Sequence, residues 1–200
     1  MSAVAEAAVR SAPDWFLAEM PRGYQTRVAE IQRLSADLHG MDRIGRLLWE
    51  IGQPLKGAVH DVFVALKFEA ELASGAAAPE VTVKLDAKRR LLLYVSETEG
   101  TIQKKGAEVA HTFQMLHELA RDEDRVVLVA NSDRVTQPSD RGQSITPDAL
   151  NFLSRMGVNF LTTPTLFKLW TGSLQDQDRA RAYIEQLYAQ DGGTFLLPPS

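Results

Sequence analysis

Two continuous apolar runs, residues 91–95 and 126–130, constrain the fold of this chain more than any other feature of its sequence. A strand made of such a run is buried on both faces, as the inner strands of a parallel or mixed sheet are. Between the two runs, Val109, Phe113 and Leu116 recur at helical spacing. Two strands joined through a helix are connected by a crossover, so we predict that they are parallel neighbours in one sheet.

A β-hairpin is predicted at the first of these runs. In residues 80–86, apolar and polar side chains alternate, which is typical of a half-buried strand. A tight turn then leads into residues 90–96, so we expect these two strands to pair antiparallel. Residues 69–73 are predicted to form a further short strand. The basic cluster Lys88-Arg89-Arg90 is expected to be a solvated part of the turn.

The first third of the chain is predicted to be helical, with glycine and proline marking the helix ends. We expect Gly40 to end the second helix, Asp42 to cap the third, and Pro54 to begin the fourth. The helix between the two apolar runs is predicted over residues 104–121. Beyond the second run we predict a helix from Thr146 to Gly157, a strand over 159–162, and helices over 164–170 and 175–189.

This order predicts an α/β fold with a mixed β-sheet flanked by helices. We divide the chain into an N-terminal tail and helical extension, residues 1–40, and an α/β domain, residues 41–200. Hydrophobic residues make up 44% of the chain, enough to build a sizeable core.

Charge and composition exclude several classes of site. The chain has no cysteine, which excludes disulfides, thiolate zinc sites and cysteine nucleophiles. Its net charge of −4 disfavours a dedicated nucleic-acid binder and favours a protein partner. No apolar run approaches the ~18 residues that a membrane helix needs. We therefore expect a cytoplasmic protein that does not bind a membrane.

The order of the predicted elements resembles the core of the PD-(D/E)xK nuclease superfamily, whose members share the restriction-endonuclease-like fold. Residues 91–100 are similar to its catalytic strand and the turn after it. Residues 126–131, with Arg134 and Arg141 downstream, are similar to its fourth strand and polar loop. Residues 160–167 look like the strand-to-helix ending of bacterial members. The resemblance covers roughly residues 41–190.

This resemblance implies a site in which two acidic residues hold Mg²⁺ and a lysine positions the attacking water. The family's Glu-x-Lys position is occupied here by Tyr94-Val95-Ser96, and its preceding acid corresponds to Glu80. A tyrosine supplies no carboxylate and a serine no positive charge. We therefore predict that the catalytic positions Glu80, Tyr94 and Ser96 are degenerate, bind no metal or other cofactor, and face a shallow pocket.

A relocated site is the alternative to this loss. Glu97 or Glu99, just past the strand, would then replace the missing acid, and Lys104 or Lys105 the missing lysine, with Mg²⁺ as cofactor. The simpler interpretation is that both glutamates are exposed turn residues, which also suit the start of the next helix. His111, on that helix, is expected to be an ordinary helix residue.

Three functions remain open, because a fold alone does not determine activity. The prediction is a non-catalytic nuclease-fold protein that acts as a binding or regulatory module through a protein partner. The first alternative is a metal-dependent DNA nuclease with a relocated acidic residue. The second is a structural subunit of a larger assembly.

Overall fold

The computed structural model describes residues 13, 15–74 and 79–198. It divides into two compact units, residues 1–42 and 43–200, and each is described by itself. In the part of the chain that the structure describes, no helix is both long and apolar enough to cross a membrane.

The N-terminal helices differ from the prediction at one boundary. After the short helix α2 (Phe16–Glu19), helix α3 (Tyr24–Gly45) runs without interruption through Gly40 and Asp42. The predicted helix end at Gly40 and cap at Asp42 are therefore wrong. A glycine inside a helix costs only about 1 kcal/mol relative to alanine, which the helix formers around Gly40 outweigh. The predicted third helix is reduced to the 3₁₀ turn η1 (Arg46–Leu48).

Helix α4 (Gly52–Ala65) leads into a six-stranded mixed sheet of strand order β1-β2-β3-β4-β5-β6. Its strands are β1 (Glu69–Leu72), β2 (Val81–Lys84), β3 (Arg90–Ser96), β4 (Asp124–Ala130), β5 (Asn159–Thr162) and β6 (Gly193–Thr194). The hairpin β2–β3 is antiparallel and the pair β3–β4 is parallel, which confirms both predicted pairings. The edge strand β6 was not predicted, because two residues carry no alternating pattern.

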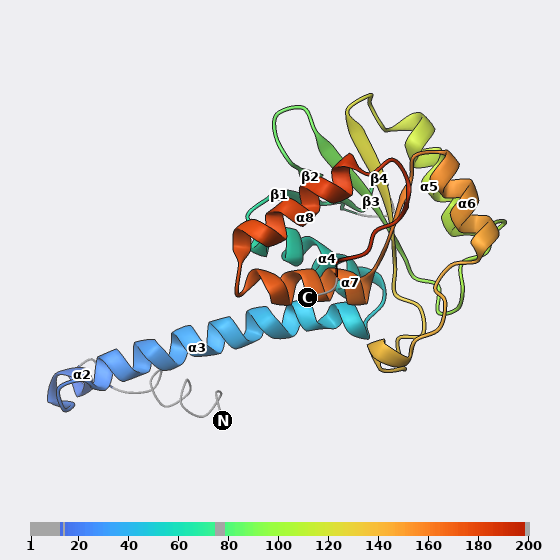
Figure 1. Ribbon diagram of the computed structural model, residues 1–200. Coiled ribbons are helices and arrows are strands. Elements are labelled where there is room, and N and C mark those ends of the chain that lie inside the picture. Colours follow the sequence, from blue (N-terminus) through green and yellow to red (C-terminus); the bar gives the residue numbers. More distant parts are fainter. Residues whose placement is uncertain (1–12, 14, 75–78, 199–200) are drawn as a thin grey trace. The chain divides into compact units, whose positions relative to one another are not determined.

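Helices cover both faces of the sheet (Figure 1). On one face α4, α7 (Thr163–Ser173) and α8 (Gln177–Ala189) enclose a core that includes Leu91 and Leu93. On the other, α5 (Ala107–Glu118) and α6 (Pro147–Arg155) enclose a second core that includes Leu92 and Leu128. Successive side chains of a strand point to opposite faces. A strand that feeds both cores is therefore apolar at nearly every position.

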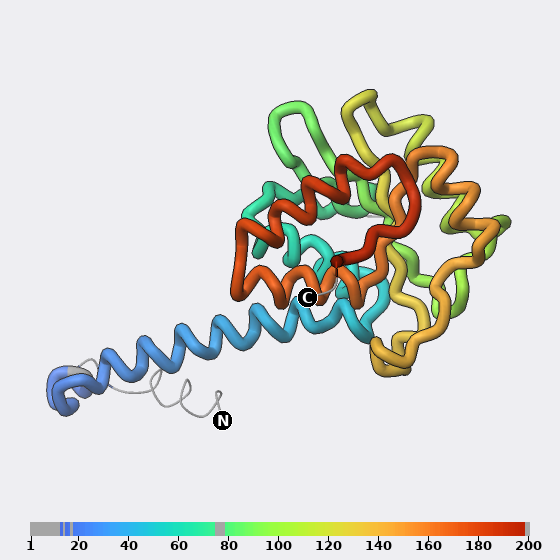
Figure 2. Tube along the Cα trace, viewed as in Figure 1, coloured from blue at the N-terminus to red at the C-terminus, as the bar shows by residue number. Residues whose placement is uncertain are grey.

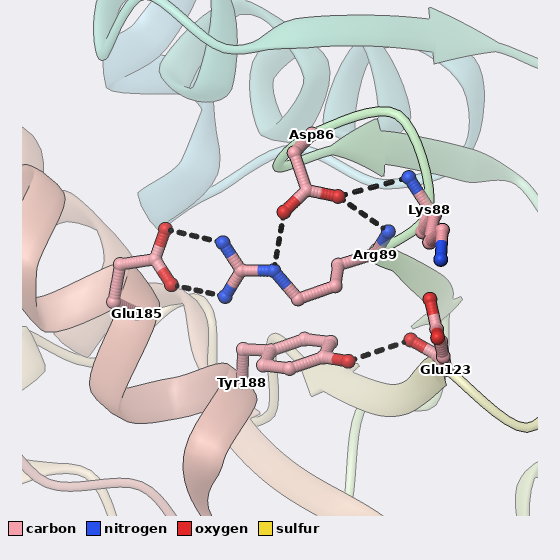
Figure 3. A network of polar contacts seen from close by, with 6 residues as sticks. All are labelled: Asp86, Lys88, Arg89, Glu123, Glu185 and Tyr188. Carbon is pink, nitrogen blue, oxygen red and sulfur yellow. Dashed lines mark hydrogen bonds and ion pairs between the residues drawn. The ribbon is translucent and has the colours of Figure 1, made fainter.

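The two ends of the sheet carry different loops. The β2–β3 turn and the loop that precedes β4 lie together at one end, and the segment after β4 runs to the opposite end (Figure 2). At the first end, Arg89 donates to the carboxylates of Asp86 and of Glu185 on α8 (Figure 3). Arg90 pairs with the buried carboxylate of Asp124. These two arginines of the basic cluster are ion-paired, whereas a solvated turn was expected.

Candidate functional site

A pocket of about 720 Å³ opens at the carboxyl end of β3, between the β2–β3 hairpin and helix α5. Four glutamates contribute to its lining, together with a single lysine, Lys56 of α4; the glutamates are Glu80, Glu97, Glu108 and Glu118. Like charges gathered in this way repel one another unless a cation lies among them. The electrostatics of the pocket therefore favour a positively charged occupant.

Lys56 joins two of these glutamates. Its ammonium lies 3.0 Å from Oε1 of Glu80 and 3.0 Å from Oε1 of Glu97. The side chains of Lys56 and Glu80 are each 14% exposed, and that of Glu97 is 51% exposed. Burial opposes the charge on Lys56, but the hydrogen bonds to Glu80 and Glu97 outweigh burial and raise its pKa. The carboxylates of Glu80 and Glu97 thus converge on one point, and the Lys56 ammonium occupies it.

The sheet itself holds Glu80 in place. The β2–β3 ladder continues to the backbone of Glu80, whose N–H donates to the carbonyl of Leu93. The next N–H along β3, that of Val95, donates to Oε2 of the Glu80 side chain. One carboxylate oxygen of Glu80 therefore extends the ladder, and the other remains directed at Lys56. An acid fixed in this way needs little reorganisation to bind a ligand.

Tyr94 takes the place on the strand where the resemblance requires an acid. Its hydroxyl lies 3.0 Å from Nδ1 of His111 on α5, and both side chains line the pocket. Burial, followed by the nearby carboxylate of Glu80, raises the pKa of Tyr94 to about 12. The phenol therefore stays protonated at neutral pH and acts as a hydrogen-bonding group, not as an anion.

Comparisons with known proteins support the fold. No protein-family model matches the sequence, and no curated protein matches it. Among solved structures, that of the restriction endonuclease FokI matches with a TM-score of 0.55 and 8% sequence identity, over 76% of this chain. The chain has the restriction-endonuclease-like fold. The match spans 30% of the FokI chain, and at this identity it establishes the fold alone.

Within the restriction-endonuclease-like fold, Glu80 and Tyr94 line the pocket as predicted, whereas Ser96 does not. Ser96 is 1% exposed, and its hydroxyl accepts a hydrogen bond from the backbone N–H of Thr98. The Thr98 hydroxyl in turn donates to the carboxylate of Glu108 on α5. The chain that leaves β3 therefore covers Ser96, and the prediction that this residue faces the pocket is wrong.

The four residues predicted for the relocated site, Glu97, Glu99, Lys104 and Lys105, do not lie together in the structure. Glu97 lies in the pocket, but Glu99 forms an ion pair with Arg134 at 2.5 Å. The ammonium of Lys104 lies 5.4 Å from the ring centroid of Phe152 on α6. Lys105 is exposed and is not among the residues lining the pocket. Of the four candidates, only Glu97 is brought to Glu80.

Sequence reasoning missed Lys56 and the pocket role of His111. A signal for Lys56 was present, because it lies on the same helical face as Val59 and Phe63, both fully buried. A lysine on the core face of a helix almost always has a partner. No comparable signal marked His111, since its partner Tyr94 is on a separate element.

The donor set of the pocket fits a hard divalent cation. Within the described residues, no group of three or more His, Cys, Asp or Glu side chains is arranged to hold a metal ion. Mg²⁺, however, is bound in many phosphoryl-transfer sites through one or two carboxylates, with water and substrate phosphate completing its shell. The converging oxygens of Glu80 and Glu97 match that smaller requirement.

Proposed function

We propose that the protein is a metal-dependent nuclease whose strand acid has been replaced by Glu97, with Lys56 as its lysine. One observation carries this proposal: the carboxylates of Glu80 and Glu97 converge on the ammonium of Lys56, at 3.0 Å each. Two acids and a lysine are the residue types that the fold family uses to cleave phosphodiesters. Here they come from α4, from the residue before β2 and from the residue after β3.

Each residue has a role that its position supports. Glu80 and Glu97 would hold Mg²⁺, which polarises the phosphate and activates water when bound. Lys56, next to both acids, offsets the charge that develops on the phosphate. The hydroxyl of Tyr94 and the imidazole of His111 line the same pocket and are placed to hydrogen-bond a phosphate or a water molecule.

The test is cleavage of labelled duplex and single-stranded DNA, and of RNA, in Mg²⁺ or Mn²⁺. We expect metal-dependent cleavage by the unmodified protein. Glu80→Gln and Glu97→Gln should each lower the rate by about 10²–10³, as loss of a preorganised electrostatic group does. Glu99→Gln is the matched control, because Glu99 is on the same segment but pairs with Arg134 and does not line the pocket; its rate should stay close to that of the unmodified protein. A folded protein that cuts none of these substrates contradicts the proposal.

A non-catalytic binding module with a protein partner is the second candidate function, and helix α3 supports it. Ile31, Leu34, Leu38 and Met41 are between 46% and 59% exposed. Their spacing of three and four residues places them on one side of the helix. The helix carries three arginines as well as three acids, and Arg33 pairs with Asp37, so the apolar seam and not a net charge would select a partner helix.

A further inference from the structure

Lys56 has a feature that the nuclease proposal does not use: its ammonium already fills the point between the two carboxylates. A divalent ion shared by Glu80 and Glu97 would need the same two carboxylates that the ammonium now contacts. Such an ion would therefore compete with the ammonium for them. The two cations would repel one another strongly in a partly buried pocket.

We propose that Lys56 is the resident cation of this pocket, which holds Glu80 and Glu97 together without metal and competes with a divalent ion for them. The inference rests on the proposed metal site but not on the cleavage reaction. In this proposal Lys56 controls metal binding: its ammonium stays between Glu80 and Glu97 until the metal concentration is high enough to displace it. Displaced, the ammonium remains in the pocket, where it can meet the phosphate of a substrate.

The neighbourhood of Lys56 supports displacement over a fixed structural role. Both of its salt bridges end at the pocket lining, and 51% of the Glu97 side chain is exposed, so one partner can move without opening the core. Glu80, by contrast, is anchored by the N–H of Val95 and would keep its place. Metal binding thus requires a lysine side chain to swing and leaves the sheet unchanged.

The chain also offers a matched comparison. Lys84 bridges Glu69 and Glu71 at 2.7 Å each, the same arrangement of one ammonium and two glutamates. Those glutamates are 68% and 61% exposed on the edge strand β1. Neither of them is buried and anchored by a backbone N–H as Glu80 is, so we expect no metal site there when Lys84 is removed.

The experiment measures Mn²⁺ and Ca²⁺ affinity by calorimetry, and thermal stability with and without these ions. Lys56→Met should bind Mn²⁺ at least about tenfold more tightly than the unmodified protein, because a like charge is removed from the site. Without metal it should melt at a lower temperature, and Ca²⁺ should restore that loss. Adding Glu97→Gln should abolish the gain, and Lys84→Met should produce none.

Unchanged or weaker metal binding by folded Lys56→Met would overturn the proposal. If that variant does not fold, the unmodified protein gives the answer by ¹⁵N NMR of its lysine ammonium groups. The Lys56 signal, protected from exchange by two salt bridges, should lose that protection as Mg²⁺ is added. Protection that persists beside a bound ion would also overturn it.

Cleavage assays distinguish a failure of this inference from a failure of the nuclease proposal. If the protein is a nuclease, Lys56→Met should bind metal more tightly and yet cleave more slowly, a split that a merely structural lysine would not produce. If the unmodified protein never cleaves but Lys56→Met gains metal affinity, the resident-cation role stands and the nuclease proposal fails.

Discussion

The carboxylate of Asp124 is fully buried at the start of β4, where two nitrogens of the Arg90 guanidinium donate to it at 2.9 and 2.6 Å. Burial alone would raise its pKa, but the hydrogen bonds from Arg90 and from the backbone of Arg121 outweigh burial, so the pKa is lowered. A lowered carboxyl pKa means that the charged form stabilises the fold. The pair also fixes the register of β3 against β4, since Arg90 is the register partner of Asp124.

We predict that Asp124→Asn lowers the free energy of unfolding at pH 7 by about 3 kcal/mol or more, because it leaves the partly buried Arg90 without its counter-charge. The contribution of the Asp124 charge is present above the unfolded pKa of about 4 and is lost as pH falls through the lowered native pKa. Urea denaturation of the two proteins should therefore show a gap that is full at pH 6 and shrinks below about pH 4. A gap that does not depend on pH would contradict this assignment. Asp37→Asn, at an exposed pair with Arg33, is the control and should change stability little.

Among the helices and strands, the sequence correctly predicted those whose hydrophobic pattern is local. Strands β3 and β5 begin and end where they were predicted, because apolar runs and their polar flanks define both boundaries. The helix end predicted at Gly40 is wrong, because the good helix formers on both sides of it in α3 outweigh its low helix propensity. The pocket was only half predictable: Glu80 and Tyr94 followed from the strand pattern, but the partners of Lys56 lie at residues 80 and 97. No local pattern connects α4 with those positions.

Among the described residues of the first unit, helix α3 contributes no buried side chain. Its single buried residue is Ile44, beyond that unit, and the four residues of its apolar seam are exposed. Most helices in proteins are stabilised by packing of an apolar face. The exposed seam, with its regular spacing of three and four residues, is the basis for our proposal that α3 packs against a partner helix.

We predict that Leu34→Asp together with Leu38→Asp abolishes such an association and leaves the α/β domain equally stable. Both side chains are more than half exposed, so their loss costs the fold little. Light scattering after gel filtration measures self-association, and fluorescence anisotropy measures binding of a synthetic amphipathic helix. A matching peptide with serines on its apolar face should bind more weakly, because the seam offers apolar contacts. Equal binding of both peptides, or no effect of the double substitution, would contradict the predicted surface.

In the whole molecule, the fold gathers acids from separate elements at the carboxyl end of β3. The chain carries a net charge of −4, and four of its glutamates line the pocket with one lysine. A polyanion such as DNA gains affinity from the phosphates that a protein neutralises. Without divalent ions, this pocket would repel phosphate; a divalent ion held by Glu80 and Glu97 would reduce its negative charge and give the phosphate a cation to bind.

We therefore predict that DNA binding depends on divalent cations even when cleavage is prevented. Anisotropy of a short labelled duplex should show weak binding in EDTA. In Ca²⁺, which fills carboxylate sites and supports little phosphoryl transfer, binding should tighten by about tenfold or more, as expected when a bound cation contacts the phosphate and reduces the repulsion from the glutamates. The effect should be absent in Glu80→Gln/Glu97→Gln, which lacks the converging carboxylates, and intact in Glu99→Gln. Equally tight binding in EDTA and in Ca²⁺ would mean that a different, basic surface recognises DNA, and the acidic pocket would then have to serve another ligand.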